Sequence, residues 1–356
     1  MKLIYGIKDK PKFGEVVLFA IQQLLAIMAA TIAVPAVVNS ACGTALPASA
    51  AIFGAGIGTF VYLIFTKSAS PVFLGSSFAF IGSMMSAFSG AASMAAGYWG
   101  LIIGAAMAGA VYVILAIVIK CCGVAWIDKL MPPVIIGPTV AIIGLSLAGN
   151  AVGDLTSSSV EGGSVYVALI CGLVTLAVTI LASTYGKKMV KLVPFIIGIL
   201  AGYACASLFA LLSYVTGNPA FTVINYSALA NVGYVSLPDF TFLLGGSLKD
   251  ITPTYLLTLF TAYVPVAFVV FAEHLADHKN LSSIIGVDLL KTPGLTRTLL
   301  GDGIGSIAGS VFGGCPNTTY GESIACVAIT RNASTVSIWG AAVLCIIVSF
   351  ISPLMA

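Results

Sequence analysis

Gly313-Gly-Cys-Pro-Asn-Thr-Thr-Tyr-Gly-Glu322 is a polar, helix-breaking run that lies between two apolar stretches of the chain. A second carboxylate, Glu273, directly follows the apolar run Tyr263-Val-Pro-Val-Ala-Phe-Val-Val-Phe-Ala272. Acidic side chains at membrane depth are costly and usually mark a substrate or proton site. The two glutamates are therefore the best indication of function in this sequence.

The composition is that of a membrane protein. Of the 356 residues, 59% are hydrophobic and 8% are charged, and the mean hydropathy is +1.11. Ordinary soluble domains carry about 25% charged residues. The length accommodates roughly ten to twelve spans of about 20 residues each. The net charge of +3, with no basic stripe and no glycine-rich phosphate motif, argues against nucleic-acid and nucleotide partners.

The eight cysteines indicate neither a disulfide framework nor a zinc site, because most lie in apolar runs and none forms a Cys-x-x-Cys motif. We expect no bound metal and no cofactor, with a proton as the coupling ion. The basic N-terminal arm, residues 1–13, precedes an apolar run that is too long for a signal peptide. The chain is therefore predicted to be a multi-pass protein of the inner cell membrane with a cytoplasmic N-terminus.

Apolar runs separated by turn residues predict an all-α polytopic fold with eleven spans. The spans cover about residues 14–38, 49–66, 72–88, 98–119, 133–151, 164–184, 189–215, 253–278, 295–313, 317–330 and 335–355. Spans 3 and 10 are predicted to be broken. Span 3 opens with Ser70-Pro71 and continues as Gly75-Ser-Ser-Phe-Ala-Phe80, and span 10 opens with Gly313-Gly314-Cys315-Pro316.

The distribution of basic residues supports this span count. With the N-terminus inside, the outer loops contain only Lys249, in the long extracellular loop predicted at 216–252. The other basic residues fall in inner loops: Lys67, Lys120, Lys129, Lys187, Lys188, Lys191, Lys279, Lys291, Arg297 and Arg331, besides the N-terminal lysines.

The span order suggests two inverted repeats of seven spans, of which about eleven spans are present. Spans 1–7 form one repeat, spans 8 onward form the second, and the broken spans 3 and 10 then occupy matching positions. Broken helices at matching positions of two repeats point to the central site of a transporter. On this expectation, about three helices of the second repeat would be missing.

Several motifs resemble the nucleobase–cation symporter family, also called nucleobase–ascorbate transporters, and in particular its bacterial uracil-permease branch. The resemblance is carried by Phe271-Ala-Glu-His274, Lys291-Thr-Pro-Gly-Leu-Thr-Arg297 and Pro316-Asn-Thr-Thr-Tyr-Gly-Glu322 with Ala328-Ile-Thr-Arg331, of which the Asn317–Glu322 block is specific. Gln22-Gln-Leu-Leu-Ala-Ile27 with Ala30-Thr-Ile-Ala-Val-Pro35 fits the first span, and Leu74-Gly-Ser-Ser-Phe-Ala-Phe80 fits the third. The resemblance runs from about Gly14 to the end of the chain.

The resemblance implies a core domain and a gate domain. Spans 1–4 (14–120) and spans 8–11 (253–356) would form the core, and spans 5–7 (121–215) would form the first half of the gate, the rest of which is absent. Transport would follow from motion of the core against the gate around a midplane site. A homodimer is a further expectation, alongside the lipid bilayer and a small nucleobase as partners.

The resemblance also implies the binding residues. Glu273 and Glu322 would be the substrate-binding carboxylates, Phe78 would pack on the base, and Tyr320 and Gly321 would lie beside it. Uracil presents two N–H donors and two carbonyl acceptors, and a carboxylate accepts N–H bonds. Charge-assisted bonds of this kind are roughly twice as strong as neutral ones.

Ser77, Thr319 and Gln23 are further candidate substrate-binding residues. The serine and the threonine could instead satisfy backbone groups freed at the breaks, and Gln23 could join two helices. Phe78 and Tyr320 have a plain packing role as their alternative, and Glu273 and Glu322 a structural hydrogen bond between helices.

Glu273, Asp277 and Glu322 are the candidate proton-coupling residues. Glu273 and Asp277 are spaced i, i+4 and share a helix face. The alternative for Asp277 is a residue at the cytoplasmic helix end. Several positions depart from the family pattern: Ser323-Ile324-Ala325 stands where Asn-Ile-Gly is usual, and Asp277 and Gln23 stand where histidines are often found.

The alternatives belong to different classes. One is a transporter for xanthine or another nucleobase, and a second is a nucleobase-binding protein that does not transport. A third is an intramembrane metalloprotease, because His274-Leu-Ala-Asp-His278 places two histidines one turn apart. An aspartyl protease using Asp302 with Asp277 is weaker, and Asp302 is expected to cap span 9 or to lie near its loop.

Overall fold

The computed structural model describes residues 3–130, 133–146, 148–156, 158, 160, 162–187, 190, 193–225, 233–240, 248–313 and 315–354. The chain divides into two compact units, one of residues 1–143 and 235–355 and one of residues 144–234. Helix α6 (Pro133–Ser146) crosses this boundary. Parts of the predicted outer loop (226–232 and 241–247), the basic residues Lys188 and Lys191, and Gly314 of span 10 lie outside the described residues.

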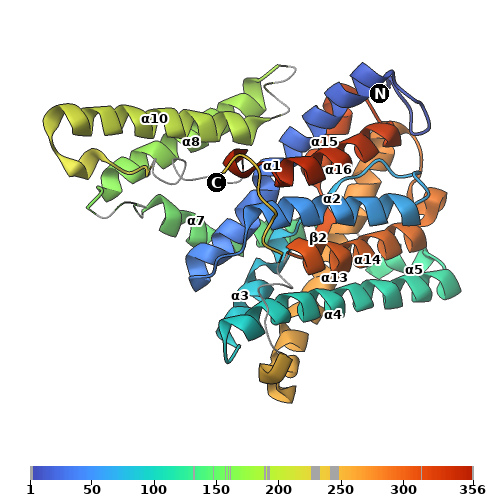
Figure 1. Cartoon of the computed structure of the whole chain (residues 1–356). Coiled ribbons are helices and arrows are strands. Elements are labelled where there is room, and N and C mark those ends of the chain that lie inside the picture. Colours follow the sequence, from blue (N-terminus) through green and yellow to red (C-terminus); the bar gives the residue numbers. More distant parts are fainter. Residues whose placement is uncertain are drawn as a thin grey trace. The chain divides into compact units, whose positions relative to one another are not determined.

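The first unit contains the same order of elements twice: two helices, a short strand, a short helix and another helix (Figure 1). The first set is α1 (Phe13–Cys42), α2 (Ala48–Phe65), β1 (Leu74–Ser76), α3 (Ile81–Ser89) and α4 (Met94–Cys122). The second set is α13 (Pro253–Ile285), α14 (Leu295–Gly313), β2 (Asn317–Thr319), α15 (Gly321–Thr330) and α16 (Thr335–Ser349). A short helix α5 (Ala125–Leu130) follows the first set.

The contacts within this unit also come in matching pairs. Helix α1 packs on α16 and α13 packs on α4; α2 packs on α16 and α14 on α4; α1 contacts α15 and α13 contacts α3. If each helix of the first set is replaced by the helix at the same position of the second set, and the reverse, every contact in this list becomes the other contact of its pair. Helices α2 and α14, which hold the same position in the two sets, contact each other. This pattern fits two related halves, and their inverted orientation stays a prediction.

Small residues let α14 approach its neighbours closely. A Cβ atom on Gly305 would lie 2.7 Å from the carbonyl oxygen of Gly58 in α2, and one on Gly303 would lie 3.1 Å from that of Gly109 in α4. Glycine at helix contacts lets backbones meet in this way in membrane proteins. Figure 1 shows α2, α14 and α4 running side by side.

Recognisable signals set the ends of α13. Thr252 caps the start, because its hydroxyl accepts a hydrogen bond from the Tyr255 amide, and Pro253 occupies the first turn. The helix ends where Gly286 adopts a left-handed φ of 71°. It therefore continues past the predicted end of span 8 at residue 278, through several polar residues.

The broken spans contain a feature that the all-α prediction did not anticipate. β1 and β2 form a two-stranded antiparallel sheet in which Leu74 pairs with Thr319, Gly75 with Thr318 and Ser76 with Asn317. Inside a membrane, backbone groups released from a helix need other partners. The two breaks supply these partners to each other, which confirms that both spans are interrupted.

Six of the described helices are long and apolar enough to cross a membrane: α1, α2, α4, α8 (Val165–Tyr185), α10 (Pro194–Thr216) and α13. Three shorter apolar helical segments lie at Phe78–Ser89, Gly321–Thr330 and Thr335–Ser349. A helical, multi-pass membrane fold is thereby confirmed.

The second unit is a helix pair preceded by α7 (Ala148–Leu155). Helices α8 and α10 pack along each other, and buried Val167, Cys171 and Ala206 form the centre of their contact. The assignment of this unit to a gate and of the first unit to a core stays a prediction.

Candidate functional site

The candidate site is built around the β1–β2 ribbon. Beyond the strand pairs, the Ser77 amide donates to the Pro316 carbonyl at 2.8 Å, and the Tyr320 amide donates to the Phe73 carbonyl at 3.3 Å. A helical segment begins directly after each strand, a 3₁₀ turn at Phe78 and α15 at Gly321. Because the strands are antiparallel, these two helix N-termini lie at opposite ends of the ribbon.

Glu322 lies in the first turn of α15 and is half-buried. The partial positive charge of a helix N-terminus stabilises a carboxylate there. Within the described part of the chain, its carboxylate has no hydrogen bond or ion pair with another side chain. The group is therefore positioned by its helix and its acceptor oxygens are not used by neighbouring side chains.

Glu273, on α13, is the second carboxylate of the candidate site. It is also half-buried and likewise lacks a side-chain partner among the described residues. Helix α13 contacts both β2 and α15. The structural hydrogen bond between helices that was the alternative for Glu273 and Glu322 is absent from this part of the chain.

Asp277 lies one turn after Glu273 and binds the ribbon. The Thr319 hydroxyl of β2 donates to an Asp277 carboxylate oxygen at 2.7 Å. Asp277 is half-buried, and α13 continues to Ile285, so Asp277 does not occupy a free helix end. This bond joins the acidic face of α13 to the strand that precedes Glu322.

The other predicted residues lie close to the ribbon in different roles. The Gln23 amide donates to the Ser323 hydroxyl, which also accepts from the Phe73 amide at 3.0 Å. Gln23 therefore joins α1 to α15, as its alternative interpretation expected. Tyr320 is 4% exposed, and its hydroxyl donates to the Ser76 carbonyl at 2.7 Å.

Phe78, Gly321 and Ser77 lie at the two helix starts. Phe78 is half-buried and packs against a core cluster that includes Tyr320. Gly321 is exposed. The Ser77 hydroxyl is buried and has no partner among the described residues, so it does not satisfy a freed backbone group there.

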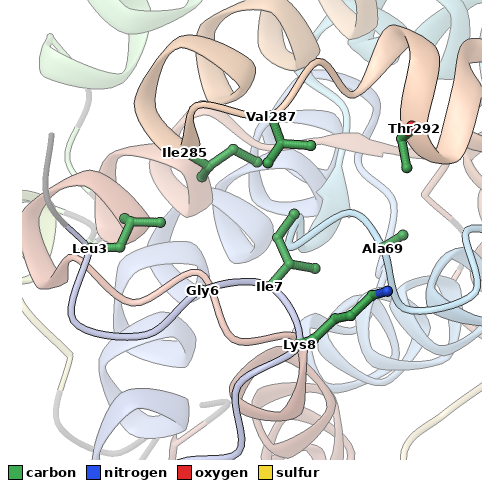
Figure 2. A pocket seen from close by; sticks show the side chains of 8 residues that line it. All are labelled: Leu3, Gly6, Ile7, Lys8, Ala69, Ile285, Val287 and Thr292. Atoms are coloured by element: carbon green, nitrogen blue, oxygen red, sulfur yellow. The ribbon is translucent and has the colours of Figure 1, made fainter.

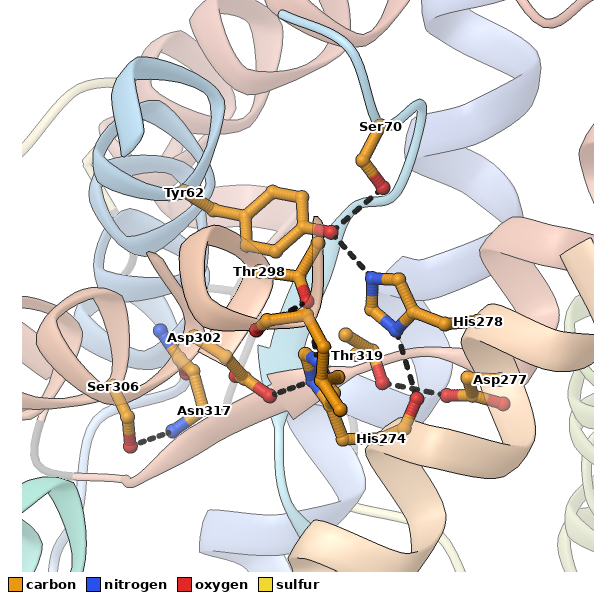
Figure 3. Close-up of polar contacts among 11 residues, drawn as sticks. Tyr62, Ser70, His274, Asp277, His278, Thr298, Asp302, Ser306, Asn317 and Thr319 are labelled. Carbon is orange, nitrogen blue, oxygen red and sulfur yellow. Dashed lines mark hydrogen bonds and ion pairs between the residues drawn. The ribbon is translucent and has the colours of Figure 1, made fainter. Parts of the chain in front are cut away.

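The prediction for Asp302 was wrong. Instead of capping a helix or lying near a loop, Asp302 is inside α14, 1% exposed, with a carboxylate oxygen 2.7 Å from His274 Nδ1 (Figure 3). The sequence Leu300-Gly-Asp-Gly303 has the glycines of a turn, which explains the error. Here the glycines instead serve close packing of α14 against α2 and α4.

His274 and His278 form the second part of this buried network. Their rings stack with centroids 4.0 Å apart, and both residues are 0% exposed. His274 Nε2 lies 3.1 Å from the Thr298 hydroxyl. His278 Nδ1 lies 2.8 Å from the His274 carbonyl, and its Nε2 lies 2.7 Å from the hydroxyl of Tyr62, which also bonds to Ser70.

These contacts remove the metalloprotease alternative. All four ring nitrogens of His274 and His278 have partners in the protein. Across the described ranges, no group of three or more histidine, cysteine, aspartate or glutamate side chains is arranged to hold a metal ion. Asp302 and Asp277 bind different partners, so they do not form an aspartyl protease pair.

One cavity in the described part of the chain lies away from the ribbon. It has a volume of about 290 Å³ and is lined by Leu3, Gly6, Ile7, Lys8, Ala69, Ile285, Val287 and Thr292 (Figure 2). The N-terminal arm that forms one wall is fixed to the segment before α16, because the Ile4 amide bonds to the Arg331 carbonyl at 2.8 Å. None of the predicted site residues lines this cavity.

A multi-pass helical unit with two interrupted spans and half-buried carboxylates beside the breaks is the arrangement of a membrane transporter. The family model described as "Permease family" matches residues 14–356. The chain therefore belongs to the xanthine and uracil permease family, within its bacterial uracil-permease branch.

The similarity to curated relatives extends along the whole chain. It is 36% identical over 359 residues to "Uracil permease" of Bacillus subtilis (strain 168), covering 100% of this chain and 76% of the relative. It is 33% identical over 352 residues to "Uracil permease" of Escherichia coli (strain K12), covering 99% and 74%.

A solved structure shares the fold. The transmembrane domain of a cyanobacterial bicarbonate transporter, BicA, matches with a TM-score of 0.65 and 15% identity, covering 98% of this chain and 87% of that domain. At this identity the match concerns the fold alone.

Proposed function

We propose that this permease carries uracil across the cell membrane together with a proton. The observation that supports it best is the pair of half-buried carboxylates, Glu273 and Glu322, whose oxygens are not taken by other side chains of the described chain. Uracil offers N–H donors that such acceptors bind. The similarity to uracil permeases makes uracil the first base to test.

In this proposal the ribbon and its helix starts surround the base. Glu273 and Glu322 accept its N–H groups, and Phe78 covers one ring face. Gly321, Tyr320, Ser77, Thr319 and Gln23 complete or support the site. Bases whose donors and acceptors do not match would leave buried polar groups unpaired, and this penalty gives specificity.

The first experiment measures the thermal stability of the purified protein with uracil, thymine, cytosine, xanthine and hypoxanthine. A ligand that binds only the folded protein stabilises it, by about 2.7 kcal/mol when the ligand concentration is 100 times its Kd. This stabilisation raises the melting temperature. We expect the largest shift with uracil and its loss in Glu322→Gln. The same substitution at Glu15, in the first turn of α1, is the matched control and should keep the shift.

Other outcomes have defined meanings. A larger shift with xanthine would replace uracil by the xanthine alternative. A shift with uracil without uptake in proteoliposomes would favour a nucleobase-binding protein that does not transport. The absence of a shift with every base, in folded protein, would contradict the proposed site.

Proton coupling is assigned to Glu273, Asp277 and Glu322. Adjacent carboxylates disfavour each other's charged form, and N–H bonds from the substrate favour the charged form of the group that accepts them. Substrate binding at one carboxylate would therefore favour proton binding at its neighbour. We expect uracil uptake to fall as external pH rises and to fall with an uncoupler. Uptake that responds to neither would contradict this part of the proposal.

The transport motion is proposed as alternating access of a core against a gate. The N-terminal arm would face the cytoplasm, and a homodimer is the expected assembly. Labelling of Cys121 and Cys122, which are exposed at the end of α4, tests the orientation. Impermeant thiol reagents should react with them only after the inner face is opened.

A further inference from the structure

A second, very small cavity lies inside the first unit beside Asp302. Its volume is about 10 Å³, and it is lined by Phe80, Ala108, Gly109, Tyr112, Val270, Asp302, Gly303, Ser306 and Asn317. These residues come from α4, α13, α14, the 3₁₀ turn and β2. Figure 3 shows Asp302, Ser306 and Asn317 next to one another.

Three residues that line this cavity each carry a buried oxygen atom with no partner among the described residues: Asp302 Oδ1, Asn317 Oδ1 and the Tyr112 hydroxyl. The other polar atoms of the same side chains are used. Asp302 Oδ2 contacts His274 Nδ1 at 2.7 Å, and Asn317 Nδ2 donates to the Gly54 carbonyl at 3.0 Å. The residues are 1%, 2% and 3% exposed, so bulk water does not supply the missing bonds.

The fourth polar group at the cavity is the Ser306 hydroxyl. It accepts a hydrogen bond from the backbone amide of Asn317 at 3.0 Å, which leaves the hydroxyl proton of Ser306 available for donation. The cavity therefore presents two acceptors, on Asp302 and Asn317, and two hydroxyl donors, on Tyr112 and Ser306. A buried polar atom without a partner costs about 1–3 kcal/mol, so this arrangement calls for a ligand.

We propose that this cavity binds one ordered water molecule that completes the hydrogen bonds of Asp302, Asn317, Tyr112 and Ser306. Water donates two hydrogen bonds and accepts two, which matches the two acceptors and two donors present. A volume near 10–15 Å³ is what one water molecule requires. A bare cation fits less well, because the protons of the Tyr112 and Ser306 hydroxyls would then lack acceptors.

The water gives Asp302 a positioning role. It links the carboxylate to Asn317, the first residue of β2, while the other carboxylate oxygen contacts His274 of α13. Asp302 and its water thus join α4, α14 and α13 to the strand that leads to the candidate binding site. This inference goes beyond the proposed function and does not depend on which base is carried.

X-ray radiolytic footprinting of the full chain in lipid nanodiscs tests the proposal. Radicals formed from an ordered water modify the side chains next to it, even where bulk solvent is excluded. We expect Tyr112 to be modified several-fold faster than Tyr62, which is also buried (0% exposed, against 3% for Tyr112) but has its hydroxyl bonded to Ser70 and His278. Equally slow modification of the two tyrosines would overturn the proposal.

A cavity-filling variant and a cation series sharpen the test. Ala108→Val should occupy the cavity and bring the Tyr112 rate down to that of Tyr62; an unchanged rate would also overturn it. The melting temperature of wild-type protein should be the same in sodium chloride and choline chloride. A sodium-specific rise that disappears in Asp302→Asn would instead assign the cavity to a cation.

Discussion

Two adjacent faces of α13 each carry two titratable side chains one turn apart, but these side chains differ in burial and in hydrogen bonding. Glu273 and Asp277 form one face and are half-buried, and His274 and His278 form the next face and are fully buried. Every ring nitrogen on the histidine face has a protein partner, whereas the Glu273 carboxylate has no side-chain partner in the described chain. Figure 3 shows the histidines directed toward Tyr62, Thr298 and Asp302, and Asp277 directed toward Thr319.

The difference shows how burial separates structural from ligand-binding polar groups. A fully buried polar group needs a partner in the protein or an ordered water, because an unpaired one costs free energy. A half-buried carboxylate can keep free acceptors for a ligand at smaller cost. On this basis the histidine face should govern stability, and the acidic face should govern binding.

The largest expected effect is on the histidine face. Asp302→Ala removes the hydrogen-bond partner of His274 together with the acceptor at the small cavity, and each buried polar group left unpaired costs about 1–3 kcal/mol of stability. Thermal unfolding in nanodiscs measures the loss. The matched control is Asp288→Ala, which breaks the exposed contact with Lys291 at 3.3 Å and should cost under about 1 kcal/mol. Equal losses would remove the distinction between the buried and exposed pairs.

The next effect is on the acidic face. Glu273→Gln replaces an acceptor-only carboxylate by an amide of the same shape. Losing one charge-assisted hydrogen bond, worth about 1.5–3 kcal/mol, should weaken uracil binding roughly 10- to 150-fold. The melting temperature without ligand should stay close to that of the wild type. Binding constants from scintillation proximity measure this, and a stable variant with unchanged affinity would contradict the proposed role.

A third change tests the histidine face at its far end. Tyr62→Phe removes the hydroxyl that lies between Ser70 and His278, leaving both polar groups buried with one partner fewer. We expect a loss of about 1–3 kcal/mol in stability and little change in uracil affinity. The control is Phe60→Tyr on the same helix, which exchanges the same two residue types in the opposite direction at another position of α2. An affinity loss larger than the stability loss would move Tyr62 into the binding site.

The smallest effect concerns the contact between the acidic face and the ribbon. Thr319→Val removes the 2.7 Å bond to Asp277 and should cost about 0.5–1.5 kcal/mol. Thr319→Ser keeps the hydroxyl and should retain most of the stability. If uptake by Thr319→Val loses its pH dependence while Thr319→Ser keeps it, the bond also takes part in proton coupling. If the two variants have the same stability and the same pH dependence of uptake, the bond contributes to neither property.

Much of the fold could be predicted because hydropathy and turn residues are local properties. The predicted span 295–313 coincides with α14, and 164–184 differs from α8 by one residue at each end. The end of α13 was placed too early because polar residues after Asp277 were taken as the helix end. Hydropathy reports the membrane boundary, whereas Gly286 sets the end of the helix.

The candidate site was predicted only in part. Glu273 and Glu322 stand out because charge is rare in this sequence, and the glycines and prolines around them predict the broken spans. Asp302 was missed because its flanking glycines resemble a turn, and the only signal for it was another acid within an apolar stretch. Its contact with His274 spans 28 residues, and that of Tyr62 with His278 spans 216.

The sequence by itself determined the membrane class, most helices, the two interruptions and the pair of glutamates, because these follow from composition and local backbone preference. Only the tertiary structure decided that the two interruptions pair as strands, that Asp302 meets His274, and that four polar residues line one small cavity. Those features depend on which distant segments meet when α14 packs between α2 and α4. Local patterns carry no information about such meetings, because buried polar groups find their partners across the fold.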